Sequence, residues 1–231
     1  MKKLVVLTGA GISAESGLRT FRDSDGLWEG YDIMEVATPG AWKKNPALVL
    51  EFYNMRRKNV ADVEPNAAHY ALAQLEKDFD VHIITQNIDD LHERAGSTRV
   101  MHLHGEIFKM RSEKNELLVA PIFNDIKIGD LASDGFQYRP AIVWFEEEVP
   151  MIQQALPVVA DADIFAVIGT SLVVYPAAGL LNYVEPSVPK FIVDRKIPYT
   201  GSRYNLTAIE KPATEGVKEM MEILRADYPN S

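Results

Sequence analysis

Short apolar runs alternate with amphipathic segments along most of this chain. Six runs have the length and the branched side chains of buried strands, at residues 4–7, 81–85, 100–104, 141–145, 164–168 and 190–193. Segments with helical spacing lie between them, at about 46–60, 67–77, 151–160 and 212–227. Apolar strands that alternate with helices predict an α/β fold with a Rossmann-like, doubly wound parallel sheet.

The alternation fails in two stretches. Residues 29–44 read as irregular, and residues 105–140 carry charge clusters and scattered apolar residues without a clear period. We therefore expect the 231 residues to form one domain, made of a large Rossmann-like lobe and a small lobe formed by insertions. Their predicted bounds are about 1–28, 64–105 and 141–231 for the large lobe and about 29–63 and 106–140 for the small lobe.

The first predicted helix places Leu48, Phe52 and Met55 at i, i+4 and i+7, which marks its core face. Tyr53 and Arg56 are three residues apart, so they share a face to one side of that stripe. The pattern alone leaves open whether these two polar side chains face solvent or a ligand.

The first predicted strand runs directly into a glycine-rich turn. Gly9, Gly11 and Ala14 fit the form GxGxxG/A, in which glycines permit a tight turn and a pyrophosphate lies against a helix N-terminus. A dehydrogenase would continue this helix and place an acidic residue about 20 residues further on. Here Gly17 and the polar cluster at 22–26 interrupt the helix, which indicates a loop that covers the ligand.

Small or polar residues follow four of the predicted strands. Ligands of doubly wound sheets bind beyond the carboxyl ends of the strands, so these sets predict a site for a ligand with ribose and phosphate groups. The sets are Gly9-Ala10-Gly11, Gln86-Asn87-Ile88-Asp89, His104-Gly105-Glu106 and Gly169-Thr170-Ser171. Each set alone is also what a simple turn requires.

His104 is the natural acid–base candidate, because imidazole titrates near neutral pH and this one ends a strand before a glycine. His102 lies on the same face of that strand one step earlier, so the pattern leaves the choice between the two open. The other three histidines lie on helices or at a strand start, where we expect structural roles: His69, His82 and His92.

Composition narrows the possible partners. Lys and Arg number 24 and Asp and Glu number 33, so the net charge of −9 disfavours nucleic acid and anionic membranes and weakly favours basic polypeptide. The absence of cysteine excludes disulfides, a thiol nucleophile and cysteine-based zinc sites, and no HExxH spacing occurs, so we expect no metal. With neither a signal peptide nor a membrane span predicted, the expected location is cytoplasmic.

Five separated motifs, taken in order, resemble the sirtuin family of NAD-dependent protein-lysine deacylases. They are GAGIS with FR and GLW, then TQNID, HGE, VWF and GTS, and the resemblance runs from about residue 4 to the C-terminus. The chain looks most like the bacterial class III sirtuins, which act on acidic acyl groups. The marks of that class are ESGLRTFRDSDGLW, VATP, FYNMRR, TQNIDDLHERAG and VYPAAG. The resemblance implies NAD as the co-substrate and acyl-lysine proteins as partners.

The resemblance assigns His104 as the general base and Asn87 as a second catalytic residue. It places NAD against the glycine turn, the covering loop and the strand ends, at Gly9, Ala10, Gly11, Ser13, Glu15, Phe21, Arg22, Trp28, Gln86, Asn87, Ile88, Asp89, Gly169, Thr170, Ser171, Asp194 and Ala213. The implied chemistry begins when the acyl carbonyl oxygen displaces nicotinamide from the ribose. His104 then activates a ribose hydroxyl, and water releases free lysine and O-acyl-ADP-ribose. Such a protein has to position its ligands and supply one general base. It has less need of a nucleophile of its own.

Tyr53 and Arg56 match the Tyr-x-x-Arg that recognises a carboxylate on the acyl chain in this class. A guanidinium binds a carboxylate through two hydrogen bonds, and a phenol adds a third donor. Ala37 stands where the class has a small residue that leaves room for a longer acyl group. Val143 and Phe145 would flank the acyl-lysine, whose peptide joins as an added strand. The implied activities are desuccinylation and demalonylation, with deacetylation beside them.

The chain departs from the family pattern in three places. Most sirtuins hold the small lobe with four cysteines, whereas this chain has none, and Ser112 and residues 132–133 stand about where they would be. Glu146 replaces the usual glycine after VWF. The segment IVDRKIP replaces an asparagine-bearing strand end, so Asp194 is the candidate for the ribose contact and Ala213 the candidate near the adenine.

Two other functions fit the same motifs. An NAD-dependent ADP-ribosyltransferase would leave ADP-ribose on protein instead of releasing O-acyl-ADP-ribose. A non-catalytic NAD or ADP-ribose-binding module would use the pocket without turnover, although retention of His104 and Asn87 argues against it. No motif specifies the protein targets, the preferred acidic acyl group or the oligomeric state.

Overall fold

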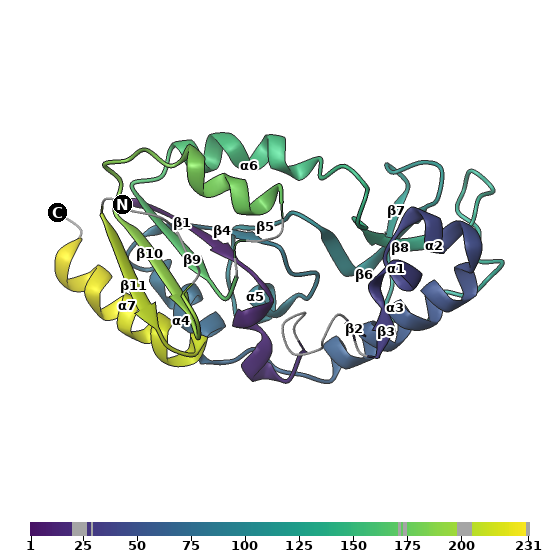
Figure 1. The fold of residues 1–231 in the computed structure, drawn as a ribbon, viewed down its shortest axis with the longest axis horizontal. Coiled ribbons are helices and arrows are strands. Elements are labelled where there is room, and N and C mark those ends of the chain that lie inside the picture. Colours follow the sequence, from purple (N-terminus) through teal and green to yellow (C-terminus); the bar gives the residue numbers. More distant parts are fainter. Residues whose placement is uncertain (20–26, 29, 171, 173–174, 198–204, 230–231) are drawn as a thin grey trace.

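A parallel sheet of six strands forms the centre of the large lobe (Figure 1). The computed structural model describes residues 1–19, 27–28, 30–170, 172, 175–197 and 205–229. The strands lie in the order β11-β10-β9-β1-β4-β5, and every neighbouring pair is parallel, which confirms the predicted fold class. Their bounds are β1 Lys3–Thr8, β4 Asp80–Thr85, β5 Val100–His102, β9 Ile164–Ile168, β10 Lys190–Asp194 and β11 Leu206–Glu210.

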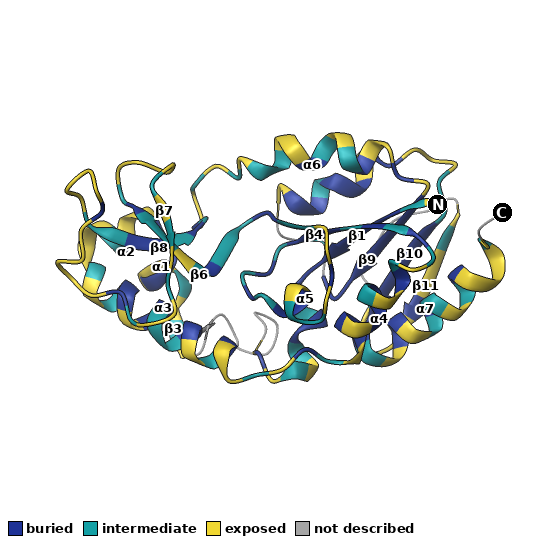
Figure 2. Ribbon diagram, turned by 180° about the vertical axis from the view of Figure 1, so that it is seen from behind, coloured by how far each residue is buried: buried dark blue, intermediate teal, exposed yellow. Residues whose placement is uncertain are grey.

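Helices cover both faces of this sheet because alternate residues of a strand point to opposite sides. In β1, Leu4 and Val6 pack towards α4 (Ala67–Leu75) and α7 (Ala213–Asp227). Val5 and Leu7 pack towards α6 (Met151–Ala160) and the 3-10 helix η4 (Ala177–Tyr183). Full burial of each such side chain contributes about 1.5–3 kcal/mol. Figure 2 shows the result, with buried strands between helices whose outer sides are exposed.

β1 lies where the strand order reverses. The chain builds outwards from β1 to β4 and β5 on one side and to β9, β10 and β11 on the other. Such a switch point leaves a crevice beyond the carboxyl ends of the strands. Two short 3-10 turns, Ala10–Ile12 and Ala14–Ser16, follow β1, and Gly17 ends the second with a φ of 101°. The interruption that the sequence predicts at Gly17 is confirmed.

The edge strand β11 is not among the predicted strands. Of its five residues only Ile209 is buried, so it presents no apolar run. Its pairing with β10 runs through backbone groups, which carry no signal in the hydrophobic pattern.

The small lobe combines an antiparallel sheet with short helices (Figure 1). The sheet has the order β7-β6-β8, with β6 Gly105–Ser112, β7 Val119–Pro121 and β8 Tyr138–Ile142. The helices are α1 Ile33–Val36, α2 Pro39–Lys44 and α3 Pro46–Ala61, with a short hairpin of β2 Leu27–Trp28 and β3 Tyr31–Asp32 before them. A further short helix, α5 Leu91–Arg94, follows β4. The stretch 29–44, expected to be irregular, therefore holds α1 and α2, each begun by a side-chain N-cap from Asp32 or Thr38.

The strand predicted at 141–145 is wrong in position and in partner. β8 ends at Ile142 and pairs antiparallel with β6 in the small sheet. The following residues leave that sheet because the Val143 N–H donates to the carbonyl of His104 (2.9 Å) and the Phe145 N–H to that of Ala37 (3.0 Å). An apolar run does not by itself distinguish a strand from a buried crossing segment.

The core stripe predicted on α3 is also wrong in part. Phe52 is buried as expected, but Leu48 and Met55 are only partly covered. Tyr53 and Arg56 are 1% and 4% exposed, so they lie inside the small lobe and not on a solvated face. The buried face of α3 is wider than one stripe because the helix packs against the small sheet and against α1 and α2.

Polar side chains of α3 hold the loops of the small lobe. Buried Arg57 donates to the carbonyls of Ile107 (2.9 Å) and Asn124 (3.2 Å) and to Oδ1 of Asn54 (2.8 Å). Asn54 in turn donates to the carbonyl of Ile126 and accepts its N–H, both at 2.9 Å. One helix therefore fixes two separate backbone segments, at 107 and at 124–126, through hydrogen bonds.

Ser112 organises the turn that follows β6. Its hydroxyl is buried, donates to Oδ2 of Asp134 (2.7 Å) and accepts the backbone N–H of Lys114 (3.1 Å) and of Asn115 (3.3 Å). Near a position where most sirtuins carry a cysteine, this chain thus links two loops of the small lobe through a hydroxyl and a carboxylate.

We expect Arg57→Met to lower the free energy of unfolding by about 2–4 kcal/mol, because the buried carbonyls of Ile107 and Asn124 lose a charged donor. Urea denaturation measures the change. The matched control is Lys58→Met on the same helix, which removes only an exposed ion pair with Asp125 (3.0 Å). The control is expected to cost less than about 1 kcal/mol. Equal losses in the two variants would contradict this role for Arg57.

Candidate functional site

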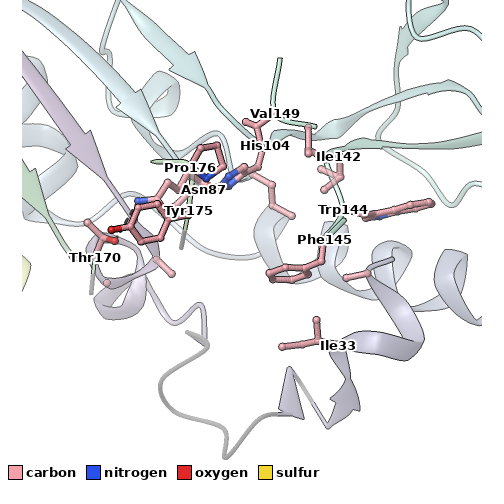
Figure 3. A pocket seen from close by; sticks show the side chains of 18 of the residues that line it. Ile33, Asn87, His104, Ile142, Trp144, Phe145, Val149, Thr170, Tyr175 and Pro176 are labelled. Carbon is pink, nitrogen blue, oxygen red and sulfur yellow. Dashed lines mark hydrogen bonds between the residues drawn. The ribbon is translucent and has the colours of Figure 1, made fainter. Parts of the chain in front are cut away.

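A cavity of about 580 Å³ lies at the switch point of the sheet and continues to the small lobe (Figure 3). Small-molecule sites typically measure about 300–1,000 Å³. The sequence-predicted residues that line it are Gly9, Ala10, Gly11, Ala37, Tyr53, Gln86, Asn87, Ile88, His104, Val143, Phe145, Gly169, Thr170, Asp194 and Ala213. Figure 3 shows Asn87 and His104 between Thr170 on one side and Trp144 and Phe145 on the other.

Two glycine turns pack directly on each other beside this cavity. The Gly9 N–H donates to the carbonyl of Ile168 (3.0 Å) and the Gly11 N–H to that of Gly169 (2.8 Å). A Cβ at Gly9 would lie 2.7 Å from the Cβ of Thr170, and a Cβ at Gly11 would lie 2.7 Å from the Cα of Gly169. The glycines are thus required by contact between the ends of β1 and β9, in addition to any contact with a ligand.

The residues around the turns suit a dinucleotide. Ala10 and Thr170 line the cavity next to the glycines, and Asp194 lines it from the end of β10. Asp194 is buried, and its Oδ1 accepts the N–H of Lys196 (3.0 Å). A carboxylate at a strand end is the group that accepts hydrogen bonds from ribose hydroxyls in doubly wound folds. Ala213, the first residue of α7, adds a small side chain that leaves room beside it.

His104 is oriented by one backbone contact. Its Nδ1 lies 2.9 Å from the carbonyl oxygen of Gln86, and because a carbonyl only accepts, Nδ1 carries the proton. The lone pair of the neutral ring is then on Nε2. Burial lowers the pKa of His104, and the Gln86 carbonyl offsets part of that effect. At neutral pH His104 is therefore an uncharged imidazole, which is the state that a general base requires.

A buried polar network fixes the side chain of Asn87. The Ser13 hydroxyl accepts from Nδ2 of Asn87 and donates to Oδ2 of Asp89, both at 3.0 Å. Burial raises the pKa of Asp89, while the backbone N–H of Leu91 and the Ser13 hydroxyl counteract it. Ser13 and Asp89, expected to contact the cofactor, lie outside the described cavity lining and orient the Asn87 amide instead.

Two histidines expected to be structural sit next to this network. His69 accepts the backbone N–H of Asn66 at the start of α4 and lies 3.5 Å from the Ser13 hydroxyl. The Nε2 of His92 lies 3.0 Å from the hydroxyl of Thr8. Burial lowers the pKa of His69 to about 4 and that of His92 well below its usual range, so both rings are neutral.

The small-lobe end of the cavity is aromatic. Tyr53 and Trp144 line it with their ring centroids 6.4 Å apart. Burial raises the pKa of Tyr53, so its hydroxyl stays protonated and is available as a donor. The charges of Arg139 and Arg56 act in the opposite direction on that pKa, which places two guanidinium groups near the phenol. Arg56 is buried one turn after Tyr53, outside the cavity lining as described.

An ion pair fixes the loop after β8. Arg139 donates to both carboxylate oxygens of Glu147 (2.7 and 3.1 Å) and to the carbonyl of Ile142 (2.8 Å). Glu147 also accepts the N–H of Trp144 (2.8 Å), and the Arg139 guanidinium lies 3.2 Å from the Trp144 ring centroid. Sequence reasoning missed Arg139 and Glu147, for which the only signal is a charged residue on either side of VWF.

Glu146 adopts a left-handed backbone conformation with a φ of 72°. This is the position at which the motif pattern expects glycine, and the loop geometry supplies the reason. A residue with a Cβ costs about 1–2 kcal/mol in this region of backbone space. The Glu146 side chain is exposed and forms part of the cavity lining.

Several predicted cofactor residues fall elsewhere. Phe21, Arg22 and Ser171 lie outside the described residues, and of Trp28 only the backbone is described, paired with Tyr31 in the β2–β3 hairpin. Glu15 is exposed and accepts the backbone N–H (3.0 Å) and the hydroxyl (2.8 Å) of Thr214. A carboxylate at the start of α7 is favoured by the helix dipole, so Glu15 joins the glycine turn to that helix.

Other lining residues were not named from the sequence. They are mostly apolar: Ile33, Ile142, Trp144, Val149, Tyr175, Pro176, Val193 and Arg195. Trp144, Tyr175 and Pro176 belong to the motifs VWF and VYPAAG, which gave a family signal without indicating contact with a ligand.

Within the described residues, no group of three or more His, Cys, Asp or Glu side chains could hold a metal ion. No helix in the described part of the chain is long and apolar enough to cross a membrane.

Comparison with protein families gives one consistent result. The model of the Sir2 family matches residues 9–176. A protein of Helicobacter pylori named NAD-dependent protein deacylase is 53% identical over 221 residues, which cover 96% of each chain. A protein of the same name from Bacteroides thetaiotaomicron is 50% identical over 230 residues, covering 97% of this chain and 98% of the relative.

Solved structures agree with the sequence relatives. The crystal structure of a Sir2 homologue–NAD complex superposes with a TM-score of 0.86 at 37% identity, covering 98% of this chain and 90% of the other. A Sir2 structure with a deacetylated p53 peptide and 3'-O-acetyl ADP-ribose superposes with a TM-score of 0.79 at 31% identity, covering 95% and 92%.

We expect Glu146→Gly to raise the free energy of unfolding by about 0.5–1 kcal/mol, because relief of the backbone strain exceeds the entropy that glycine adds to the unfolded chain. Glu148→Gly is the matched control, since Glu148 is a neighbouring exposed glutamate that is not among the positive-φ residues described. The control is expected to lose about 0.5–1 kcal/mol. Urea denaturation distinguishes the two, and a loss of stability in both would contradict strain at Glu146.

Proposed function

The chain belongs to the Sir2 family and is an NAD-dependent protein deacylase, and we propose that it prefers lysines carrying succinyl or malonyl groups. The observation that carries this proposal is one continuous cavity. It joins a neutral histidine at the carboxyl edge of the sheet to buried Tyr53 in the small lobe, whose pKa is raised by burial while the charges of Arg139 and Arg56 act against that rise.

The large-lobe end of the cavity supports our assignment of the NAD site. Ala10 and Thr170 would lie along the diphosphate, and Asp194 would accept from the adenosine ribose. Gln86 and Asn87 would address the nicotinamide ribose. Bound NAD supplies the electrophilic ribose carbon, from which nicotinamide leaves.

His104 and Asn87 would do the protein's share of the chemistry. The Nε2 lone pair of His104 faces the cavity without a proton to lose first, so it would take the proton of a ribose hydroxyl. The Ser13 hydroxyl fixes the Asn87 amide, so that Asn87 would orient its ligand without reorganising. Catalysis of this kind depends on placement more than on a protein nucleophile.

The small-lobe end supports an acidic acyl group. Tyr53 keeps its proton and lines the cavity, so its hydroxyl would donate to a carboxylate. Arg56 would supply the charge, and Ala37 would leave room for the acyl chain. Val143 and Phe145, held by the Arg139–Glu147 ion pair, would flank the lysine.

Cytoplasmic location and the absence of nucleic-acid partners stay predictions from the sequence.

We expect Arg56→Met to reduce kcat/KM for succinyl- and malonyl-lysine peptides by about 10–100-fold, because a charge-assisted hydrogen bond contributes about 1.5–3 kcal/mol. Turnover of the matched acetyl-lysine peptide, which has no carboxylate, is expected to change by less than about 3-fold. Nicotinamide release with the matched peptides measures both.

Lys58→Met, an exposed change on the same helix, serves as the control and should leave the acyl preference as it is. An equal loss on acetyl- and succinyl-lysine in Arg56→Met would rule out recognition of the carboxylate. ADP-ribose retained on protein, in place of free O-acyl-ADP-ribose, would favour the transferase alternative.

The lowered pKa of His104 predicts the acid limb of the pH profile. The base works when neutral, so kcat/KM should be fully present above the pKa and fall as the pH drops through it. The midpoint is expected below about pH 6.5, the usual histidine value. His104→Ala should lower kcat/KM by about 10²–10⁴-fold at neutral pH. A midpoint above neutrality would contradict this assignment of the base.

A further inference from the structure

Two histidines, one at the end of β5 and one just after it, hold two consecutive carbonyls of the loop after β4. The Nδ1 of His104 lies 2.9 Å from the carbonyl oxygen of Gln86. The Nδ1 of His102 lies 3.0 Å from the carbonyl oxygen of Asn87. The loop that presents the Asn87 side chain to the cavity is thus held by the end of β5 and by the base that follows it.

The two rings differ at their second nitrogen. His104 lines the cavity, whereas the Nε2 of His102 lies 2.8 Å from Oε1 of Glu93 on α5. A carbonyl and an ionised carboxylate both only accept, so each ring nitrogen of His102 must donate. That arrangement requires the doubly protonated imidazolium, next to a neutral His104.

We propose that His102, as an imidazolium paired with Glu93, is a positioning residue that fixes the Asn87 backbone for catalysis beside His104. The inference rests on the proposed function for the roles of Asn87 and His104. It assigns a role to the histidine that the sequence pattern could not distinguish from the base.

The groups around His102 favour its charge. Burial opposes it, since the side chain is 7% exposed, but the hydrogen bond and charge of Glu93, the Asn87 carbonyl and the charge of Glu106 on β6 together raise the pKa of His102. Asp89 also faces it with a carboxyl group, and His92 is the neighbouring imidazole. His92 is neutral, so it adds no repulsion.

Deprotonation of His102 would break one of its two contacts. A neutral imidazole has a single N–H, so either the Asn87 carbonyl or the Glu93 carboxylate would then face a lone pair. The cation is present below the raised pKa and is lost as pH rises through it. The enzyme should therefore have an alkaline limb in kcat, on the opposite side from the acid limb of His104.

Glu93→Gln separates the charge from the geometry. Without the carboxylate, burial lowers the pKa of His102 and the ring becomes neutral. The introduced amide can donate to Nε2, so Nδ1 keeps its proton and its bond to Asn87. We expect Glu93→Gln to stay active with the alkaline limb weakened or lost. His102→Phe removes the donor to Asn87 altogether, and its kcat should fall by about 10–100-fold with KM for the acyl peptide little changed.

His82→Phe is the matched control. His82 also pairs with a carboxylate, Asp80, at 3.1 Å. It lies in the amino-terminal half of β4, whereas the site is beyond the carboxyl ends of the strands. Its pH profile and kcat should match the wild type. The measurements are nicotinamide release from NAD and a succinyl-lysine peptide between about pH 6 and pH 10, and NMR titration of the ring nitrogens of His102.

The outcomes separate this inference from the proposed function. An active wild type with the same alkaline limb in Glu93→Gln, or with full kcat in His102→Phe, would overturn the role of His102. A His102 ring that carries one proton at neutral pH would overturn it as well, even if His102→Phe fails to fold. A wild type that releases no nicotinamide from any acyl peptide would sink the proposed function, and the NMR titration would still decide the protonation state.

Discussion

The contact between the ends of β1 and β9 is the constraint on which the rest of the structure depends. The turns at Gly9–Gly11 and Gly169 touch backbone to backbone with no space for a Cβ, and the N–H groups of Gly9 and Gly11 donate to the carbonyls of Ile168 (3.0 Å) and Gly169 (2.8 Å). This contact sets how far the two halves of the sheet splay at the switch point. The cavity, the position of Thr170 and the entry of the chain into the small lobe all follow from that spacing.

Around this contact the site is built from polar groups that hold one another. Ser13 fixes the Asn87 amide, His104 takes the Gln86 carbonyl and Glu15 ties the glycine turn to α7. Buried polar groups are costly unless every one is paired, so such a network either exists complete or lowers stability. These bonds position Asn87, His104 and Glu15 before any ligand arrives, which is what catalysis by placement requires.

Much of this could be predicted from the sequence, and the failures have physical causes. Continuous apolar runs that alternate with helical segments predict the parallel sheet, because its strands are buried on both faces. The edge strand β11 and helices α1 and α2 escape that logic, since backbone pairing and caps such as Thr38 organise them. Tyr53 and Arg56 were found by motif and not by periodicity. Contacts between distant segments determine the partners of Arg139, the φ of Glu146 and the hydrogen bond of His102 to the Asn87 carbonyl. A pattern of single residues does not contain such contacts.

The small lobe is held together by groups other than thiols. Arg57, Asn54 and Ser112 hold it through hydrogen bonds between side chains and backbone. None of these groups has a thiolate to oxidise, and the chain has no cysteine anywhere. Peroxide and disulfide exchange act on cysteine thiolates, and a competing ligand removes zinc from them. This lobe contains no cysteine, so none of these processes has such a group to act on. The small-lobe end of the cavity is therefore bordered by a lobe whose loops are held by hydroxyl, amide and guanidinium groups.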